Sequence, residues 1–199
     1  LKITAAGGTN TSGGTTADLD DVRGVETVTI VDSTTAGTDA KLTLAESSTV
    51  ATDVAVLTID ATSLDGGIST FDEVFTLVGN GSAIPLNVKS GGGADILTAA
   101  TKNDTIDGGG GIDTAVFGSG NNRINLASTS AQYTGEGRDT LTSIENVNSG
   151  GGNDIINGNN SANTINGGAG NDTINGWSGN DTINGGVGDD TLYGGSGND

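Results

Sequence analysis

The first half of the chain alternates apolar and polar residues in short runs, and none of these runs keeps a helical period. The runs are rich in β-branched residues and are joined by loops of threonine, serine, glycine and aspartate. This pattern predicts short β-strands and an all-β fold. The predicted strands are "ETVTIVD" (26–32), "KLTLAE" (41–46), "VAVLTID" (54–60), "EVFTLVG" (73–79) and "PLNVKS" (85–90).

Two arrangements of these strands fit the sequence. One is a small β-sandwich, and the other is a set of irregular solenoid rungs that continues into the second half. Val88 lies nine residues before Leu97, so the spacing passes into the nine-residue period that follows and favours continuous stacking. We divide the chain into an N-terminal β-rich region, 1–89, and a repeat region, 90–199, with an irregular insertion at about 117–147.

The second half repeats a nine-residue pattern in which aspartate and a large aliphatic residue recur two places apart. The aspartate positions are Asp154, Asp172, Asp181, Asp190 and Asp199, with Asn163 in the remaining one, and the aliphatic positions are Ile156, Ile165, Ile174, Ile183 and Leu192. An earlier block has Asp95, Asp104, Asp113 and Asn122, followed by Leu97, Ile106, Ala115 and Ile124. The insertion breaks the period, although Asp139 and Leu141 keep the two-place spacing.

A glycine-rich turn that ends in aspartate suits a hard cation. Calcium takes six to eight oxygen ligands at about 2.3–2.6 Å, and it accepts both carboxylates and backbone carbonyls. Glycine allows backbone conformations that aim successive carbonyls inward. If a short strand follows each aspartate, two repeats complete one coil. Repeats n and n+2 then stack at the strand spacing of about 4.8 Å, with an ion-sized gap between their turns.

The best copies are "GGAGNDTIN" (167–175), "GWSGNDTIN" (176–184) and "GGVGDDTLY" (185–193). They follow the pattern G-G-x-G-x-D-x-U-x, where U is a large aliphatic residue. Over about 90–199 the sequence therefore resembles the haemolysin-type calcium-binding (RTX) nonapeptide repeat family. The resemblance implies a right-handed parallel β-roll, or β-solenoid, that binds several Ca²⁺ ions. Each ion is held by aspartates and glycine carbonyls of two stacked turns.

The resemblance assigns the metal ligands residue by residue. The predicted side-chain ligands are Asp95, Asp104, Asp113, Asp154, Asp172, Asp181, Asp190, Asp199 and Asn163. The predicted carbonyl ligands are Gly91, Gly93, Gly109, Gly111, Gly150, Gly152, Gly167, Gly168, Gly170, Gly176, Gly179, Gly185, Gly186, Gly188, Gly195 and Gly197.

The nine-residue grid also predicts which ligands share an ion. The best pairs are Asp154 with Asp172, Asp172 with Asp190, and Asp181 with Asp199. Asp95 with Asp113 comes next. Asn163 opposite Asp181 provides one charge fewer, so that site should be weaker. Asp104 is paired with Asn122, but its turn, "AATKND" (99–104), lacks the glycines.

Composition and charge narrow the function. Only 32% of the chain is hydrophobic and 36 residues are glycine, which cannot supply an ordinary globular core, so the repeats should be disordered without calcium. The net charge of −18 argues against nucleic acid and anionic membrane as partners and favours a cation. Histidine and cysteine are absent, which excludes the usual catalytic triads, so we expect no enzyme activity. No apolar stretch is long enough to span a membrane.

The expected function is that of a calcium-binding structural module of a secreted or cell-surface protein. Members of the resembled family are typically exported by type I secretion and fold on meeting external calcium. "SIENV" (143–147) and "GVETVTI" (24–30) resemble pieces of large bacterial surface proteins, including S-layer proteins. Neighbouring copies or cell-surface glycans are candidate partners besides calcium. The alternative is a calcium-dependent C-terminal folding and secretion module of an exported protease, lipase or epimerase.

Three other interpretations of the repeats remain open on the sequence. The tract is a disordered low-complexity segment, or its Asn-Gly pairs are the turns of an antiparallel meander, or its regular threonines form an ice-binding face. The aliphatic residue at every ninth position argues against the first, the aspartate register argues against the second, and a row of threonines is usually a solvated β face. The aromatic residues Phe117, Trp177 and Tyr193 are expected to pack rather than to bind a ligand.

Overall fold

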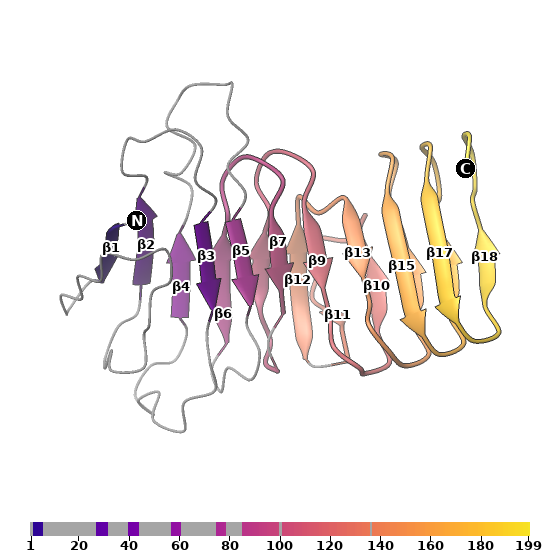
Figure 1. The fold of residues 1–199 in the computed structure, drawn as a ribbon, viewed down its shortest axis with the longest axis horizontal. Helices are drawn as coiled ribbons and strands as arrows, with labels where there is room; N and C mark the ends of the chain where they lie inside the picture. The colour runs from indigo at the N-terminus through magenta and orange to yellow at the C-terminus, as the bar shows by residue number, and fades with distance from the viewer. Residues whose placement is uncertain are drawn as a thin grey trace.

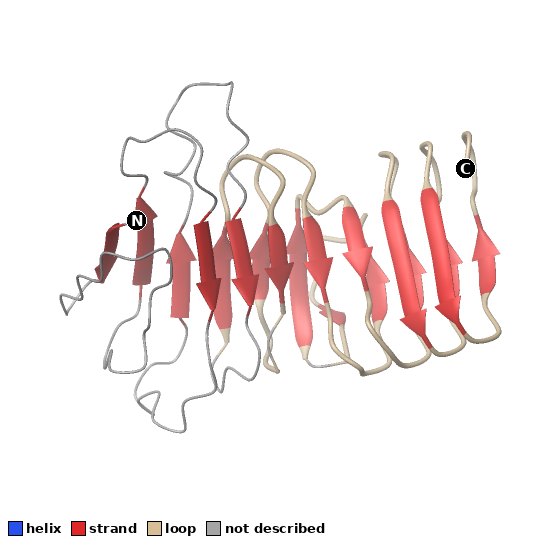
Figure 2. Ribbon diagram, in the orientation of Figure 1, coloured by secondary structure: helices blue, strands red, loops and turns tan. Residues whose placement is uncertain are grey.

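The computed structural model of the chain describes residues 2–5, 27–31, 40–43, 57–60, 75–78, 85–99, 101–135 and 137–199. These residues form strands and loops (Figure 2). None of the described residues belongs to a helix that is long and apolar enough to cross a membrane.

The strands are short and follow one another along the whole chain (Figure 1). In the first half and at its boundary they are β1 (Lys2–Ala5), β2 (Thr27–Val31), β3 (Ala40–Thr43), β4 (Leu57–Asp60), β5 (Phe75–Val78), β6 (Leu86–Lys89) and β7 (Ile96–Thr98). The middle strands are β8 (Thr105–Asp107), β9 (Thr114–Val116), β10 (Arg123–Asn125), β11 (Gln132–Tyr133), β12 (Arg138–Thr142) and β13 (Asn146–Asn148). The last are β14 (Ile155–Asn157), β15 (Thr164–Ala169), β16 (Thr173–Asn175), β17 (Thr182–Val187) and β18 (Thr191–Tyr193).

The strands build the two walls of an elongated roll, with the chain ends at its opposite ends (Figure 1). The first wall contains β2, β4, β6, β8 and β12, followed by β10, β14, β16 and β18; β11 lies against both β12 and β10. The second wall contains β3, β5, β7, β9, β13, β15 and β17. Neighbouring strands are parallel, except that β1 pairs with β2 and β11 with β12 in antiparallel fashion.

The register confirms a coil of two nonapeptides. Ile156 pairs with Ile174 on the first wall, and Ile165 pairs with Ile183 on the second, so equivalent residues are 18 apart. This parallel pairing overturns the antiparallel meander. The period arises because a six-residue turn and a three-residue strand carry the chain from one wall to the other.

The five strands expected in the first half are present as β2, β3, β4, β5 and β6. The other residues of those segments lie outside the described residues, except for Pro85 and Ser90. β4 pairs with β6 and β6 pairs with β8, all in parallel, so the first wall continues from the N-terminal region into the repeats. The observed pairing is that of a continuous solenoid and not of a sandwich.

The core is a column of aliphatic side chains between the walls. Each three-residue strand points its central residue inward and the two flanking residues outward. Ile156, Ile165 and Ile174 are fully buried, whereas Leu192 in the last strand is 47% exposed because no further coil covers it.

Two of the three aromatic residues were predicted wrongly. Phe117 is buried, as expected, but Trp177 and Tyr193 are more than half exposed. Trp177 lies in a turn at the edge of the roll, and Tyr193 is the last, outward-facing residue of β18. Neither position faces the core.

The insertion changes the order of strands without interrupting the roll. The chain passes from β9 to β10, returns to form β12 between β8 and β10, and then continues with β13 on β9. As a result Thr105 pairs with Thr140 and Thr114 with Asn146, offsets of 35 and 32 residues instead of 18. The irregular segment thus forms one complete, non-standard coil of the same solenoid.

Candidate metal centre

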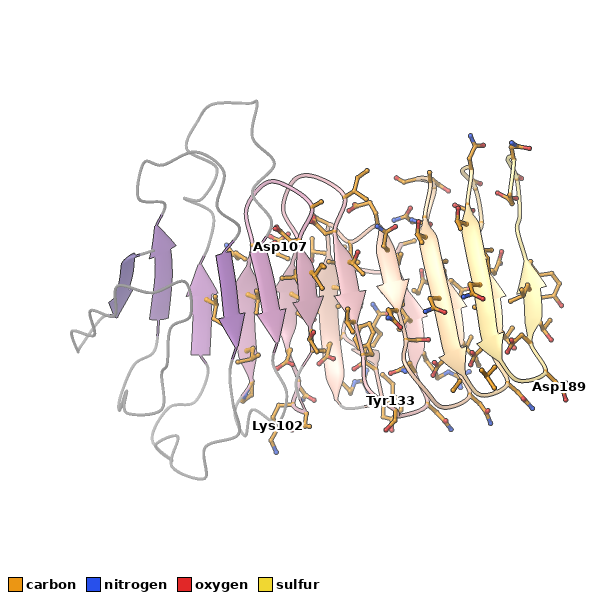
Figure 3. The ribbon with its side chains drawn as sticks, viewed as in Figure 1. Lys102, Asp107, Tyr133 and Asp189 are labelled. Atoms are coloured by element: carbon orange, nitrogen blue, oxygen red, sulfur yellow. The ribbon has the colours of Figure 1, made fainter. Side chains whose placement is uncertain are left out.

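The turns lie in two rows along the long edges of the roll. We call the residue in the aspartate position of each turn the slot residue. The first edge carries the slot residues Asp95, Asp113, Glu145, Asn163, Asp181 and Asp199, and the second carries Asp104, Asp139, Asn122, Asp154, Asp172 and Asp190. Figure 3 shows Lys102 and Asp189, from the turns that end at Asp104 and Asp190, projecting from this second edge. Strand pairing therefore brings turns that are far apart in sequence into one row.

A ladder of hydrogen bonds joins neighbouring slot residues. The backbone N–H of Asp154 donates to Oδ1 of Asp172 at 2.8 Å, and the N–H of Asp172 donates to Oδ1 of Asp190 at 2.9 Å. The same bond joins Asp95 to Asp113, Asn163 to Asp181, and Asp181 to Asp199. The structure thus places these predicted ion-sharing pairs next to each other.

The second carboxylate oxygen has no such partner in several turns. Oδ2 of Asp113, Asp154, Asp172 and Asp181 is buried and accepts no hydrogen bond. The parent side chains are at most 5% exposed. A carboxylate accepts hydrogen bonds and cannot donate them, so burying one oxygen without a donor is costly unless a cation lies beside it.

Burial also changes the acidity of these groups. The pKa of Asp113 is raised to about 7 from an ordinary value of 3.8, mainly by burial; the hydrogen bond from the Asp95 backbone lowers it, and the nearby charges of Asp95, Glu145 and Asp107 raise it. Burial likewise raises the pKa of Asp154 above its ordinary value. Both shifts show that the negative charge is poorly solvated, and a divalent ion would relieve this.

The glycines at the start of the turns make room for the same oxygens. A Cβ atom on Gly167, Gly176 or Gly185 would overlap Oδ2 of the aspartate that ends its own turn. Only glycine therefore fits at these three positions while the carboxylate points across the turn.

The other predicted carbonyl ligands share a backbone conformation. Gly91, Gly93, Gly109, Gly111, Gly150, Gly152, Gly168, Gly170, Gly179, Gly186, Gly188, Gly195 and Gly197 all have positive φ. Gly170, with φ of 133°, shows why: a side chain there would be strained and would collide with the carbonyl oxygen of Gly152 in the stacked turn. Carbonyl oxygens thus project into the spaces between turns.

The donor set fits calcium. In the gaps between two aspartates the facing groups are carboxylate and carbonyl oxygens, which hard cations prefer, and the sequence has no histidine or cysteine to favour a softer metal. At Asn163, by contrast, the amide nitrogen donates to the carbonyl of Glu145 at 2.7 Å, and the amide oxygen accepts the N–H of Asn159. Within the described ranges no three acidic side chains gather at one point. Two carboxylates per gap must therefore be supplemented by backbone carbonyls, as in other calcium sites of mixed ligands.

The predicted pairing of Asp104 with Asn122 is wrong. The N–H of Asp104 donates to Oδ1 of Asp139 at 2.7 Å, and the N–H of Asn122 donates to Oδ1 of Asp154 at 2.7 Å. The error arises because β12 is inserted between β8 and β10, which separates two turns that are 18 residues apart.

Two slot residues were missed by the sequence assignment. Asp139 occupies a slot on the second edge, and Glu145 occupies one on the first, where its Oε2 accepts the N–H of Asp113 at 2.9 Å. Both precede a buried aliphatic residue, Leu141 or Val147, by two places. That two-residue spacing could have identified both slot residues from the sequence. They were overlooked because the insertion shifts them off the nine-residue period.

Residues 90–124, 148–183 and 178–199 match the sequence model of the family described as RTX calcium-binding nonapeptide repeat (4 copies). These segments are RTX repeats. No curated protein and no solved structure matches the chain.

The RTX repeats establish the coarse function. Such repeats bind calcium ions in several of their turns, and they form a β-roll like the one observed here. The chain therefore contains a calcium-binding structural module built from RTX repeats. The family match omits 125–147, which is most of the insertion.

Proposed function

We propose that this chain is a structural segment of a secreted or cell-surface protein, and that its RTX repeats fold when they meet calcium after export. The observation that supports the proposal is the row of buried, unpartnered Oδ2 atoms at Asp113, Asp154, Asp172 and Asp181. These groups destabilise the stacked turns without a cation and stabilise them with one.

Calcium shifts the folding equilibrium because the sites exist only in the stacked roll. An ion that binds the folded state alone stabilises it by RT ln(1 + [L]/Kd), which is about 2.7 kcal/mol at a calcium concentration 100-fold above Kd. Several gaps add their contributions. A chain with this property stays unfolded at low calcium and becomes ordered at high calcium, which matches the change between the inside and the outside of a cell.

The strand pairing favours a structural or adhesive segment over the alternative of a secretion module attached to an exported enzyme. β2, β4 and β6 extend the first wall of the repeats, so the described strands on both sides of residue 90 build a single roll. A long roll of this kind acts as a rigid spacer. Its outward-facing residues, such as Thr164 and Thr182, would face neighbouring copies or cell-surface glycans.

Far-UV circular dichroism tests this proposal. The protein is prepared in chelator and titrated with calcium, and separately with magnesium as the matched control ion. We expect a transition from coil to β-structure with calcium and none with magnesium, which demands regular octahedral geometry and retains its waters. A spectrum that is already β in chelator and does not respond to calcium would refute folding on calcium.

A further inference from the structure

The gap between Asn122 and Asp154 is filled by a side-chain amide. Nδ2 of Asn122 lies 2.8 Å from the carbonyl oxygen of Gly120, 3.0 Å from that of Ser149 and 3.0 Å from Oδ1 of Asp154. Three oxygens from two stacked turns therefore converge on one nitrogen. Asn122 itself is buried.

The surrounding groups fix the orientation of this amide, and they leave its Oδ1 buried without a hydrogen-bond donor. All three neighbours are acceptors, so the NH₂ group, and not the amide oxygen, must face them. The acceptors also have the chemistry of calcium ligands, because they are one carboxylate and two carbonyls. The amide nitrogen thus occupies the place where the ligands of an ion would meet, and it offers them partial positive charge and hydrogen bonds.

A hydroxyl group has a comparable role at the next slot residue of the same edge. The Oγ1 of Thr134 donates to Oδ2 of Asp139 at 2.5 Å, while Oδ1 of Asp139 accepts the N–H of Asp104. Both carboxylate oxygens of Asp139 therefore have protein donors. In the regular turn that ends at Asp172, the position of Thr134 is held by Gly167 and the corresponding Oδ2 accepts no hydrogen bond.

We propose that the side chains of Asn122 and Thr134 take the place of calcium ions on the second edge, so that the insertion is a calcium-independent junction within a calcium-dependent roll. This inference rests on the proposed function, since it assumes that the regular gaps bind calcium. On this edge calcium binding then begins at the gap between Asp154 and Asp172. The junction lets the chain change strand order where the glycine-rich turns are missing.

The test is the number of calcium ions bound per chain, measured by equilibrium dialysis with ⁴⁵Ca²⁺ on the whole chain. Asn122→Asp replaces the amide with a carboxylate and opens a normal two-carboxylate gap with Asp154. We expect this variant to bind one more ion than the unmodified protein. It should also need a higher calcium concentration to fold in the circular-dichroism titration, because the new charge faces three oxygens until an ion binds.

Asn121→Asp is the matched control, because it adds the same charge at the adjacent, exposed residue. It retains the Oδ1 atom that accepts the N–H of Asn153, and we expect no change in the ion count. If Asn122→Asp binds the same number of ions as the unmodified protein, but more tightly, Asn122 already ligates an ion through its oxygen and the proposal is overturned.

Thr134→Val provides a second measurement that does not depend on the folding of Asn122→Asp. Removing the hydroxyl should lower the urea midpoint by a similar amount at saturating calcium and at calcium just above the folding transition, with no change in the ion count. Loss of an ion in Thr134→Val would overturn the proposal. Failure of this inference can be told apart from failure of the proposed function. If the proposed function were wrong, the unmodified protein itself would bind no calcium.

Discussion

The regular repeats and the insertion differ in how they stabilise the buried carboxylate of the slot residue. In the repeats, each slot carboxylate accepts one backbone N–H through Oδ1, and Oδ2 of Asp154, Asp172 and Asp181 is left buried without a donor. In the insertion, Asp139 receives the N–H of Asp104 on one oxygen and the hydroxyl of Thr134 on the other. A slot in this roll can therefore be satisfied either by an ion or by protein donors.

The two solutions differ at the first position of the turn. Three turns that face ion gaps have glycine there, because the carboxylate points across the turn at Gly167, Gly176 and Gly185. In the turn that ends at Asp154 this position is Ser149, whose hydroxyl donates to the carbonyl of Gly167. In the turn that ends at Asp139 it is Thr134, which donates to the slot carboxylate. The glycine-poor turn that ends at Asp104 stacks on this last turn, where Gly137 lies against the carbonyl of Lys102.

The largest expected difference is between Asp172→Asn and Asp139→Asn. Asp172 faces two regular gaps, so the amide removes charge from both. Loss of one ion costs about 2.7 kcal/mol at a calcium concentration 100-fold above Kd. In Asp139→Asn the new amide can donate to the hydroxyl of Thr134, and the loss should be about 1 kcal/mol or less. Urea unfolding at saturating calcium and at calcium just above the folding transition measures both.

The calcium dependence of these losses sharpens that comparison. As calcium is lowered towards the folding transition, the loss for Asp172→Asn should shrink, because fewer ions are bound and the amide removes a poorly solvated charge. Asp139→Asn should show the same small loss at each calcium concentration. Equal losses for the two variants in calcium would contradict the assignment of Asp172 to ion-binding gaps.

A smaller difference is expected between glycines of the two regions. Gly170→Ala forces φ of 133° on alanine and drives its Cβ into the carbonyl of Gly152, so we expect a loss of about 3 kcal/mol. Gly135, in the insertion, has φ of 73°, and a Cβ there would lie 3.0 Å from Cα of Gly120. Gly135→Ala should lose about 1–2 kcal/mol.

Gly110→Ala is the control for both glycine variants. Nothing lies within 4 Å of a Cβ at this position, so its effect on the free energy of unfolding should be within about 0.5 kcal/mol of zero. Urea midpoints in calcium give all three values. A Gly170→Ala protein as stable as Gly110→Ala would show that the stacked turns are not in close contact.

The smallest effect concerns the side chains held at positive φ. Among the described residues these are Trp177, with φ of 77° in a repeat turn, and Ser143, with φ of 52° in the insertion. Trp177→Gly removes a backbone strain of about 1–2 kcal/mol. Glycine is also freer in the unfolded chain, which offsets part of this stabilisation. We expect a net gain below about 1 kcal/mol, and a smaller change for Ser143→Gly. Thermal unfolding in calcium compares the two, and a clear loss for Trp177→Gly would mean that its indole packs on the turn.

Local features of the fold could be predicted well from sequence. The two-place spacing of Asp172 and Ile174 defines a turn that ends in a carboxylate and a strand whose middle residue faces the core. The distance of 18 residues between Asp154 and Asp172 then follows, because two such units are needed to return to the same wall. The same reasoning gave the pairs Asp95 with Asp113 and Asp181 with Asp199, which the hydrogen-bond ladder brings together.

The sequence by itself therefore determined the repeating unit of this protein: its strands, its glycine-rich turns and the carboxylates at their ends. Only the tertiary structure decided which turns are neighbours across the insertion, where Asp139 joins Asp104, Glu145 joins Asp113 and Asn122 joins Asp154. The physical reason is that strand direction and side-chain alternation depend on adjacent residues. The order in which β8, β12 and β10 stack depends on pairings 32 and 35 residues apart, which no local period encodes.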